Sequence, residues 1–247
     1  MSTKRRMSMG RTPGKRQRQE EDEERKKEAL QTGKTAAMEV EVVPPTDAKP
    51  QTLQNGYIHV GAPAPDFKCD ALVDMKFKEV AMKDYHGKFI AILFYPLDFT
   101  FVCPTEIISF AERIDDFHAV NCEVLGCSTD SKFTHLAWCQ TPREKGGVGQ
   151  IPFPLLADKS MEVSKKYGVL NEAAGVAHRT LVIIDTKLVI REVIANDSSI
   201  GRSVDETLRL IQALQYADKH GQVCPAGWKP GDQAIDPNEK KMDISKE

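Results

Sequence analysis

Six cysteines are the residues of this chain that could do chemistry, and their spacing limits the kind of chemistry. They are Cys69, Cys103, Cys122, Cys127, Cys139 and Cys224. None forms a C-x-x-C pair for dithiol exchange, and none stands in a Cys/His cluster with zinc spacing, so neither a metal nor another cofactor is expected. A chain of this length without a secretory signal is not expected to use structural disulfides. A reversible disulfide between distant cysteines remains to be considered.

Cys103 has the sequence context that best suits a reactive thiol. The apolar run 89–95, bounded by Gly87 and Pro96, predicts a buried central strand just before it. Pro104 suits the start of a helix, where free amides and the helix dipole favour an anion such as a thiolate. Ligand crevices in open α/β sheets also lie past the ends of central strands. The alternative is that Cys103 is a small buried hydrophobic residue.

The elements that would position this thiol alternate between strand and helix. They are a helix over 104–119, a strand over 122–128, a helix over 131–140, a hairpin of 180–185 and 188–194, and a helix that Ser203-Val-Asp-Glu206 opens as a capping box and that runs to about Ala217. This order predicts an α/β fold with a central mixed sheet and helices on both faces.

The first 55 residues differ in composition from the rest of the chain. Seven lysine and arginine residues precede the first acidic residue, and the acidic run 20–24 follows them. Segregated charge with few aromatics predicts a disordered extension over 1–55, with a short solvated helix around 19–31. We expect the compact domain over 56–222 and a C-terminal arm over 223–247. No apolar run is long enough to span a membrane.

The basic residues of the extension form two clusters, Lys4-Arg-Arg6 and Lys15-Arg-Gln-Arg18. This pattern resembles a bipartite nuclear import signal, so we expect residues 4–18 to bind an import receptor. The predicted location is the nucleus or, if the tail is only solvated, the cytoplasm. The same charges could bind nucleic acid non-specifically, although the tail lacks aromatic residues for base stacking.

The pattern Pro96-x-x-x-Thr100-x-x-Cys103 resembles the active-site signature of peroxiredoxins, the thioredoxin-dependent peroxidases of the AhpC/TSA family. The resemblance extends from about Tyr57 to Pro230. It includes Gly146-Gly-Val-Gly149, Arg179, Asn196-Asp197, Gly201-Arg-Ser-Val-Asp-Glu206 and Val223-Cys-Pro-Ala-Gly-Trp-Lys-Pro230. The family has a thioredoxin-like fold, which agrees with the α/β prediction.

The resemblance implies a role for each residue of the signature. Cys103 would attack hydrogen peroxide or an organic hydroperoxide, and Thr100 and Arg179 would supply polar contacts to it. Pro96 would shield the pocket from water. Glu106 would orient the arginine; the alternative is a solvated charge in the first turn of a helix.

The resemblance also implies that Cys224 is the resolving cysteine. It would condense with the Cys103 sulfenic acid of a neighbouring subunit to form an intersubunit disulfide. The implied assembly is a homodimer, with five dimers in a ring of ten chains, and the implied reductant is thioredoxin. A chaperone or redox-signalling role, which ring-forming members can have, is an alternative or additional function.

The other four cysteines match no catalytic position of the family. Cys122 and Cys127 are five residues apart on one predicted strand, so their side chains are expected on opposite faces. Gly146-Gly-Val-Gly149 matches a loop linked to sensitivity toward overoxidation, but residues 236–247 lack the Tyr-Phe pair that usually accompanies it. We therefore expect disulfide formation to outcompete further oxidation of Cys103.

Overall fold

The computed structural model describes residues 58–238 of the chain. The predicted extension over 1–55, with its helix around 19–31 and its basic clusters, lies outside these residues. Residues 239–247, at the end of the predicted arm, also lie outside them.

Strands and helices alternate through most of the described chain. The strands are β1 (Lys68–Val73), β2 (Lys76–Ala81), β3 (Phe89–Phe94), β4 (Cys122–Ser128), β5 (Leu155–Ala157), β6 (Leu170–Asn171), β7 (Val176–Ala177), β8 (Thr180–Ile184) and β9 (Ile190–Ala195). The helices are α2 (Val102–Glu112), α3 (Ile114–Ala119), α4 (Lys132–Gln140), α5 (Glu162–Lys166) and α6 (Val204–His220), with short 3-10 helices η1 (Met82–Tyr85) and η2 (Arg143–Lys145). Within residues 58–238, no helix combines the length and apolar character needed to cross a bilayer.

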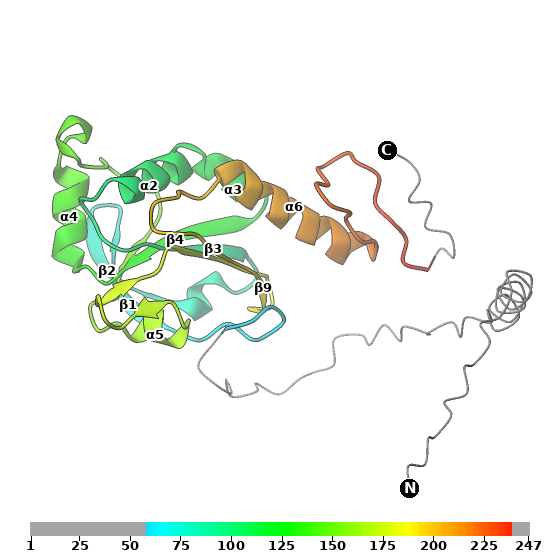
Figure 1. Ribbon diagram of the computed structural model, residues 1–247, viewed down its shortest axis with the longest axis horizontal. Helices are drawn as coiled ribbons and strands as arrows, with labels where there is room; N and C mark the ends of the chain where they lie inside the picture. Colours follow the sequence, from blue (N-terminus) through cyan, green and yellow to red (C-terminus); the bar gives the residue numbers. More distant parts are fainter. Residues whose placement is uncertain (1–57, 239–247) are drawn as a thin grey trace, which may run out of the picture. The chain divides into compact units, whose positions relative to one another are not determined.

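Seven strands of the described chain form one sheet in the order β2-β1-β5-β4-β3-β8-β9. The pairs β3–β4 and β4–β5 are parallel, and the remaining neighbours are antiparallel. Figure 1 shows this sheet as the central layer, with α2, α3, α4 and α6 on one side and α5 on the other. The structure therefore confirms the predicted mixed sheet with helices on both faces.

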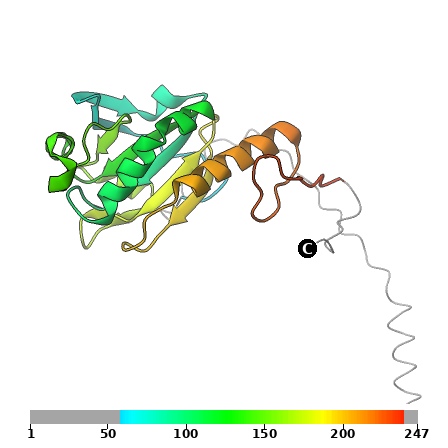
Figure 2. The same ribbon diagram turned by 90° about the horizontal axis from the view of Figure 1, so that it is seen from above.

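The central strand β3 is buried along its whole length because both of its faces are covered. Phe89, Ala91 and Leu93 pack with α2, α3, α4 and α6, while Ile90 and Ile92 pack in the core beneath α5 and η1. Seen from above, the green and orange helices lie across the same side of the sheet (Figure 2). The apolar run is continuous because side chains on both faces of this central strand are buried, as predicted.

Two of the predicted helices have bounds that differ from the sequence prediction. The helix expected over 104–119 begins at Val102 and is divided at Arg113, where the backbone leaves the helical region at φ −112° and ψ 16°. The Arg113 amide bonds the Phe110 carbonyl at 3.3 Å in a tighter turn. The last helix starts at the predicted Ser203 cap but continues to His220, because Gly221 is the residue that adopts the left-handed conformation ending it.

Candidate active site

Cys103 lies in the first turn of α2, just past the end of β3. It is the second helical residue and Pro104 the third, so the predicted placement at a helix N-terminus is confirmed, with the proline two positions later than expected. The side chain is 1% exposed and belongs to the core between the sheet and α2. Cys103 is therefore buried, as the alternative of a small buried hydrophobic residue predicted. It also has the helix N-terminal position that favours a thiolate.

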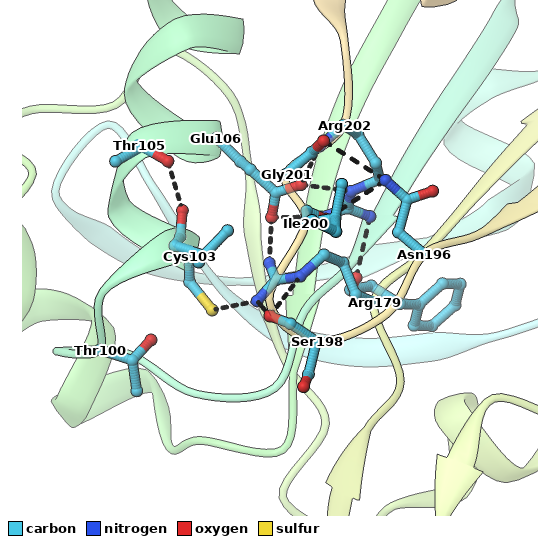
Figure 3. Close-up of polar contacts among 12 residues, drawn as sticks. Thr100, Cys103, Thr105, Glu106, Arg179, Asn196, Ser198, Ile200, Gly201 and Arg202 are labelled. Carbon is cyan, nitrogen blue, oxygen red and sulfur yellow. Dashed lines mark hydrogen bonds and ion pairs between the residues drawn. The ribbon is translucent and has the colours of Figure 1, made fainter.

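Arg179 immediately precedes β8, the neighbour of β3, and its guanidinium reaches the Cys103 sulfur. The Nη2 atom lies 3.6 Å from Cys103 Sγ (Figure 3). Nε and Nη2 also donate to the carbonyl oxygen of Ser198, at 3.2 and 2.9 Å. Nη1 donates to Glu106. A fixed cationic donor therefore faces the sulfur inside a site almost closed to solvent, where charges interact more strongly than in water.

Glu106 lies one turn beyond Cys103 on α2 and is bound by two arginines. Its side chain is 2% exposed, which rules out the alternative of a solvated charge. One oxygen accepts from Nη1 of Arg179, and Arg202 donates to both oxygens at 2.7 and 3.0 Å. Burial alone would raise the pKa of Glu106, but the hydrogen bonds and charge of Arg202, with the charge of Arg179, outweigh it and lower the pKa.

Arg202 is a site residue that the sequence analysis did not single out. Besides Glu106, its Nη1 donates to the carbonyls of Phe94 and Thr180, at 2.9 and 2.8 Å. These carbonyls belong to β3 and β8, so the arginine links two strands to the acid that holds Arg179 (Figure 3). A signal was present, because Arg202 directly precedes the capping box in the motif Gly201-Arg-Ser-Val-Asp-Glu206.

Thr100 and Pro96 lie on the loop that connects β3 to α2. The Thr100 hydroxyl donates to the Leu97 carbonyl at 2.9 Å, which leaves its oxygen able to accept a further hydrogen bond. Pro96 is half-buried at the start of the loop. Within residues 58–238, neither side chain is hydrogen-bonded to Cys103. Of the predicted site residues, Arg179 contacts the sulfur directly, and Glu106 is joined to it through Arg179.

Asp98 anchors this loop to the body of the domain. Its buried carboxylate accepts from the Tyr95 hydroxyl at 2.9 Å and is hydrogen-bonded to Nδ1 of His135 at 2.7 Å. Its amide donates to Asp130 at 2.9 Å. Burial raises the pKa of Asp98, and the hydrogen bond and charge of His135 offset only part of that effect. These contacts fix the segment that leads into Cys103.

Cys224 lies after α6, on the described part of the C-terminal arm. Its half-buried sulfur contacts the Ala213 carbonyl oxygen at 3.6 Å, and both Cys224 and Cys103 are free thiols. Burial raises the pKa of Cys224, and the charge of Arg209 counteracts this in part. After Gly221 the arm turns back and packs beside α6, where Trp228 contacts Arg209 and Tyr216 (Figure 2).

The remaining four cysteines are buried and free. Cys122 and Cys127 lie on β4 and pack into the cores on opposite faces of the sheet, as predicted from their spacing. Burial raises the pKa of Cys69 and of Cys139 to about 12, and it raises the pKa of Cys122 and Cys127 further. At neutral pH all four are therefore held as thiols, which are poor nucleophiles.

A cysteine at the N-terminus of a helix, next to a central strand and beside a buried arginine, defines a cysteine-dependent oxidoreductase of thioredoxin-like fold. The AhpC/TSA family matches residues 60–193, and the C-terminal domain of 1-Cys peroxiredoxin matches residues 213–245. Peroxiredoxin-2 of Bos taurus is 59% identical over 189 residues, which are 76% of this chain and 94% of the relative. Peroxiredoxin 2 of Drosophila melanogaster is 57% identical, over 72% of this chain and 93% of the relative.

Solved structures similar to this chain are also peroxiredoxins. The reduced 2-Cys peroxiredoxin of Plasmodium vivax is 47% identical with a TM-score of 0.70, over 72% of this chain and 92% of that one. The mitochondrial 2-Cys peroxiredoxin of Plasmodium falciparum is 43% identical with a TM-score of 0.65, over 68% of this chain and 100% of that one. The chain belongs to the AhpC/TSA family of peroxiredoxins, and its activity is that of a thiol peroxidase.

Proposed function

We propose that Cys103 is the peroxidatic cysteine of this thiol peroxidase, and that its substrates are hydrogen peroxide and organic hydroperoxides. The observation that carries the assignment is the 3.6 Å contact between Arg179 Nη2 and Cys103 Sγ. The thiolate attacks the terminal oxygen of the peroxide, forming an S–O bond while the O–O bond breaks. The product is Cys103 sulfenic acid, and the departing alkoxide or hydroxide takes a proton to become alcohol or water.

The residues around Cys103 bind the peroxide, stabilise the leaving oxygen and hold the site in place. Arg179 stabilises the negative charge that moves from sulfur to the leaving oxygen. The Thr100 hydroxyl, whose proton is committed to the Leu97 carbonyl, accepts the hydrogen of the bound hydroperoxide and aligns it for attack. Pro96 shields the pocket from water. Glu106 positions Arg179, and Arg202 holds Glu106 against β3 and β8.

Cys224 is the resolving cysteine in this proposal. The described part of its arm packs along α6 at Arg209, Ala213 and Tyr216, and the peroxidatic Cys103 is buried at the start of α2. This arrangement favours reaction of Cys224 with the Cys103 sulfenic acid of a second subunit. The second thiolate then displaces hydroxide from the sulfenic sulfur and leaves an intersubunit disulfide.

Two surfaces of the described chain suit association with further copies into a dimer and a ring of ten. Among the named strands β9 pairs only with β8, and residues 61–62 cover its outer edge at Ile190, which leaves the edge from Arg191 to Ala195 available for another strand. Exposed aromatic rings form the second surface, where Phe77 and Phe133 lie 5.1 Å apart. Among the similar structures, a Plasmodium yoelii peroxiredoxin modified at its N-terminus forms an artifactual octamer.

Thioredoxin is the reductant we propose for the intersubunit disulfide. The test is peroxide consumption with thioredoxin, thioredoxin reductase and NADPH. Cys103→Ser should be inert, and Cys224→Ser should consume one equivalent and then stop. Cys139→Ser, which removes a buried thiol outside the site, should match the wild type. Rapid turnover by Cys103→Ser would disprove the assignment, and absence of a disulfide-linked dimer on a non-reducing gel would disprove the intersubunit bond.

For location, we propose that residues 4–18 bind a nuclear import receptor and bring part of the protein into the nucleus. The support is the spacing of the two basic clusters. A fluorescent reporter carrying residues 1–30 should accumulate in nuclei, and replacing Lys4, Arg5 and Arg6 with alanine should return it to the cytoplasm. Equal distribution of both reporters would contradict the proposal.

A further inference from the structure

Arg209 joins α6 to the loop that carries Cys224. Its Nη1 donates to the Trp228 carbonyl oxygen at 2.9 Å. Its Nε and Nη2 donate to the two oxygens of Glu206 at 2.6 and 2.7 Å, an arrangement that uses the full guanidinium fork. Glu206 therefore fixes the orientation of the guanidinium, and the guanidinium in turn holds the arm.

The arm loop, residues 223–235, is closed at its base and anchored at its middle. Two backbone hydrogen bonds of 2.9 and 3.0 Å join Val223 to Ile235. Trp228 is 2% exposed, and its ring lies 4.9 Å from that of Tyr216 on α6. Because Arg209 binds the carbonyl of this same tryptophan, it fixes the part of the loop that is most firmly packed.

Cys224 lies at the base of the arm loop, next to the paired Val223. Its sulfur contacts the carbonyl of Ala213, which is one helical turn beyond Arg209 on the same face of α6. Burial raises the pKa of Cys224, and Arg209 provides the charge that opposes this increase. The same arginine thus holds the loop and favours the reactive form of its thiol.

We propose that Arg209 is a positioning residue for the second half of the catalytic cycle. It holds the arm loop on α6 so that Cys224 is presented to an oxidised Cys103, and it favours the Cys224 thiolate. This inference rests on the proposed roles of the two cysteines. In the step concerned, the Cys224 thiolate forms an S–S bond with the sulfenic sulfur of Cys103 as the S–O bond breaks. Cys224 is oxidised, the sulfenic sulfur is reduced, and the departing hydroxide takes a proton to become water.

Other charges near Arg209 limit how strongly it acts on the thiol. Glu206 on α6 and Glu192 on β9 are both close enough to raise the pKa of Arg209. Arg209 lines a cavity of about 560 Å³. Lys229 of the arm loop and Arg113, at the junction of α2 and α3, line the same cavity. Arg113 binds Asp116 and Asp205, and it makes no hydrogen bond to the described residues of the arm, 221–238. It is therefore a matched control, an arginine of the same cavity without the contact to the loop.

The test separates the two half-reactions in the full-length protein. Reduced protein is mixed with one equivalent of hydrogen peroxide, and sulfenic acid and disulfide are followed by rapid quench and mass spectrometry. Arg209→Met should form sulfenic acid at the wild-type rate but form disulfide roughly tenfold more slowly, as expected for loss of a charge-assisted hydrogen bond. The pH midpoint of disulfide formation should rise in Arg209→Met and stay unchanged in Arg209→Lys. Arg113→Gln should behave like the wild type.

Three outcomes would overturn this inference. They are an unchanged rate of disulfide formation in Arg209→Met, an equal slowing in Arg113→Gln, and pH midpoints that are the same in Arg209→Met and Arg209→Lys. Arg209→Lys keeps the charge, so it still tests the pH midpoint if the methionine variant loses the packed loop. If the wild type itself forms no Cys103–Cys224 disulfide, the proposed function fails before the role of Arg209 is reached.

Discussion

Nη2 of Arg179 lies 3.6 Å from Sγ of Cys103, although the two residues are 76 positions apart in the chain. The contact exists because β8 pairs with β3, which brings Arg179, just before β8, to the end of β3, where the loop 95–101 leads into Cys103. Glu106 and Ser198 bind the same guanidinium and fix its direction. A donor held in this way needs no reorganisation when charge moves from sulfur to oxygen.

Replacing Arg179 with lysine should slow the oxidation of Cys103 by hydrogen peroxide by roughly 100-fold, the usual cost of losing one preorganised donor. Lysine keeps the charge but cannot bind Glu106, Ser198 and the sulfur from one planar group. Stopped-flow measurement of the second-order rate constant checks this. An unchanged rate constant would show that charge alone is sufficient.

Replacing Glu106 with glutamine should lower the free energy of unfolding by about 3–5 kcal/mol, because Arg179 and Arg202 lose their buried counter-charge. Glu112→Gln is the control, since Glu112 lies on the same helix and pairs with Arg143 in an exposed bridge. Its loss should cost less than about 1 kcal/mol. Urea denaturation of both variants measures the difference, and equal costs would contradict the assigned role of the buried network.

The stabilising effect of Glu106 should depend on pH. Its pKa in the folded protein is below the ordinary value of 4.5, so folding favours the charged carboxylate. The stabilisation is complete above the unfolded-state pKa and is lost as the pH falls through the folded-state pKa. The stability difference between wild type and Glu106→Gln should therefore be constant from pH 7 to about pH 5 and shrink in more acidic solution. A difference that grows on acidification would refute this prediction.

The cysteines should differ in their reaction with iodoacetamide at neutral pH. Cys224 is half-buried and should be alkylated in the folded protein. Cys69, Cys122, Cys127 and Cys139 should be protected until urea is added, because they are buried and their raised pKa values keep them protonated. Peptide mass spectrometry reports the modification at each site. Early labelling of Cys122 or Cys127 would indicate that the sheet opens readily.

Local patterns in the sequence were sufficient for most of the fold. The apolar run 89–95 located β3, the strand over 122–128 has the predicted bounds, and Ser203 caps α6 as its motif indicated. These features depend on neighbours along the chain, through burial periodicity and capping hydrogen bonds. The placement of Cys103 at the start of a helix followed from the same kind of information.

The surroundings of the thiol required the tertiary structure. The sequence allowed Glu106 to be a solvated charge, and the motif that contains Arg202 did not show which residues this arginine binds. Glu106 meets Arg179 and Arg202 across 73 and 96 residues. Only the order of strands in the sheet creates these contacts, because pairing β8 with β3 determines which distant charges are buried together. The sequence by itself determined where the reactive sulfur stands, and the assembled sheet decided which charges act on it.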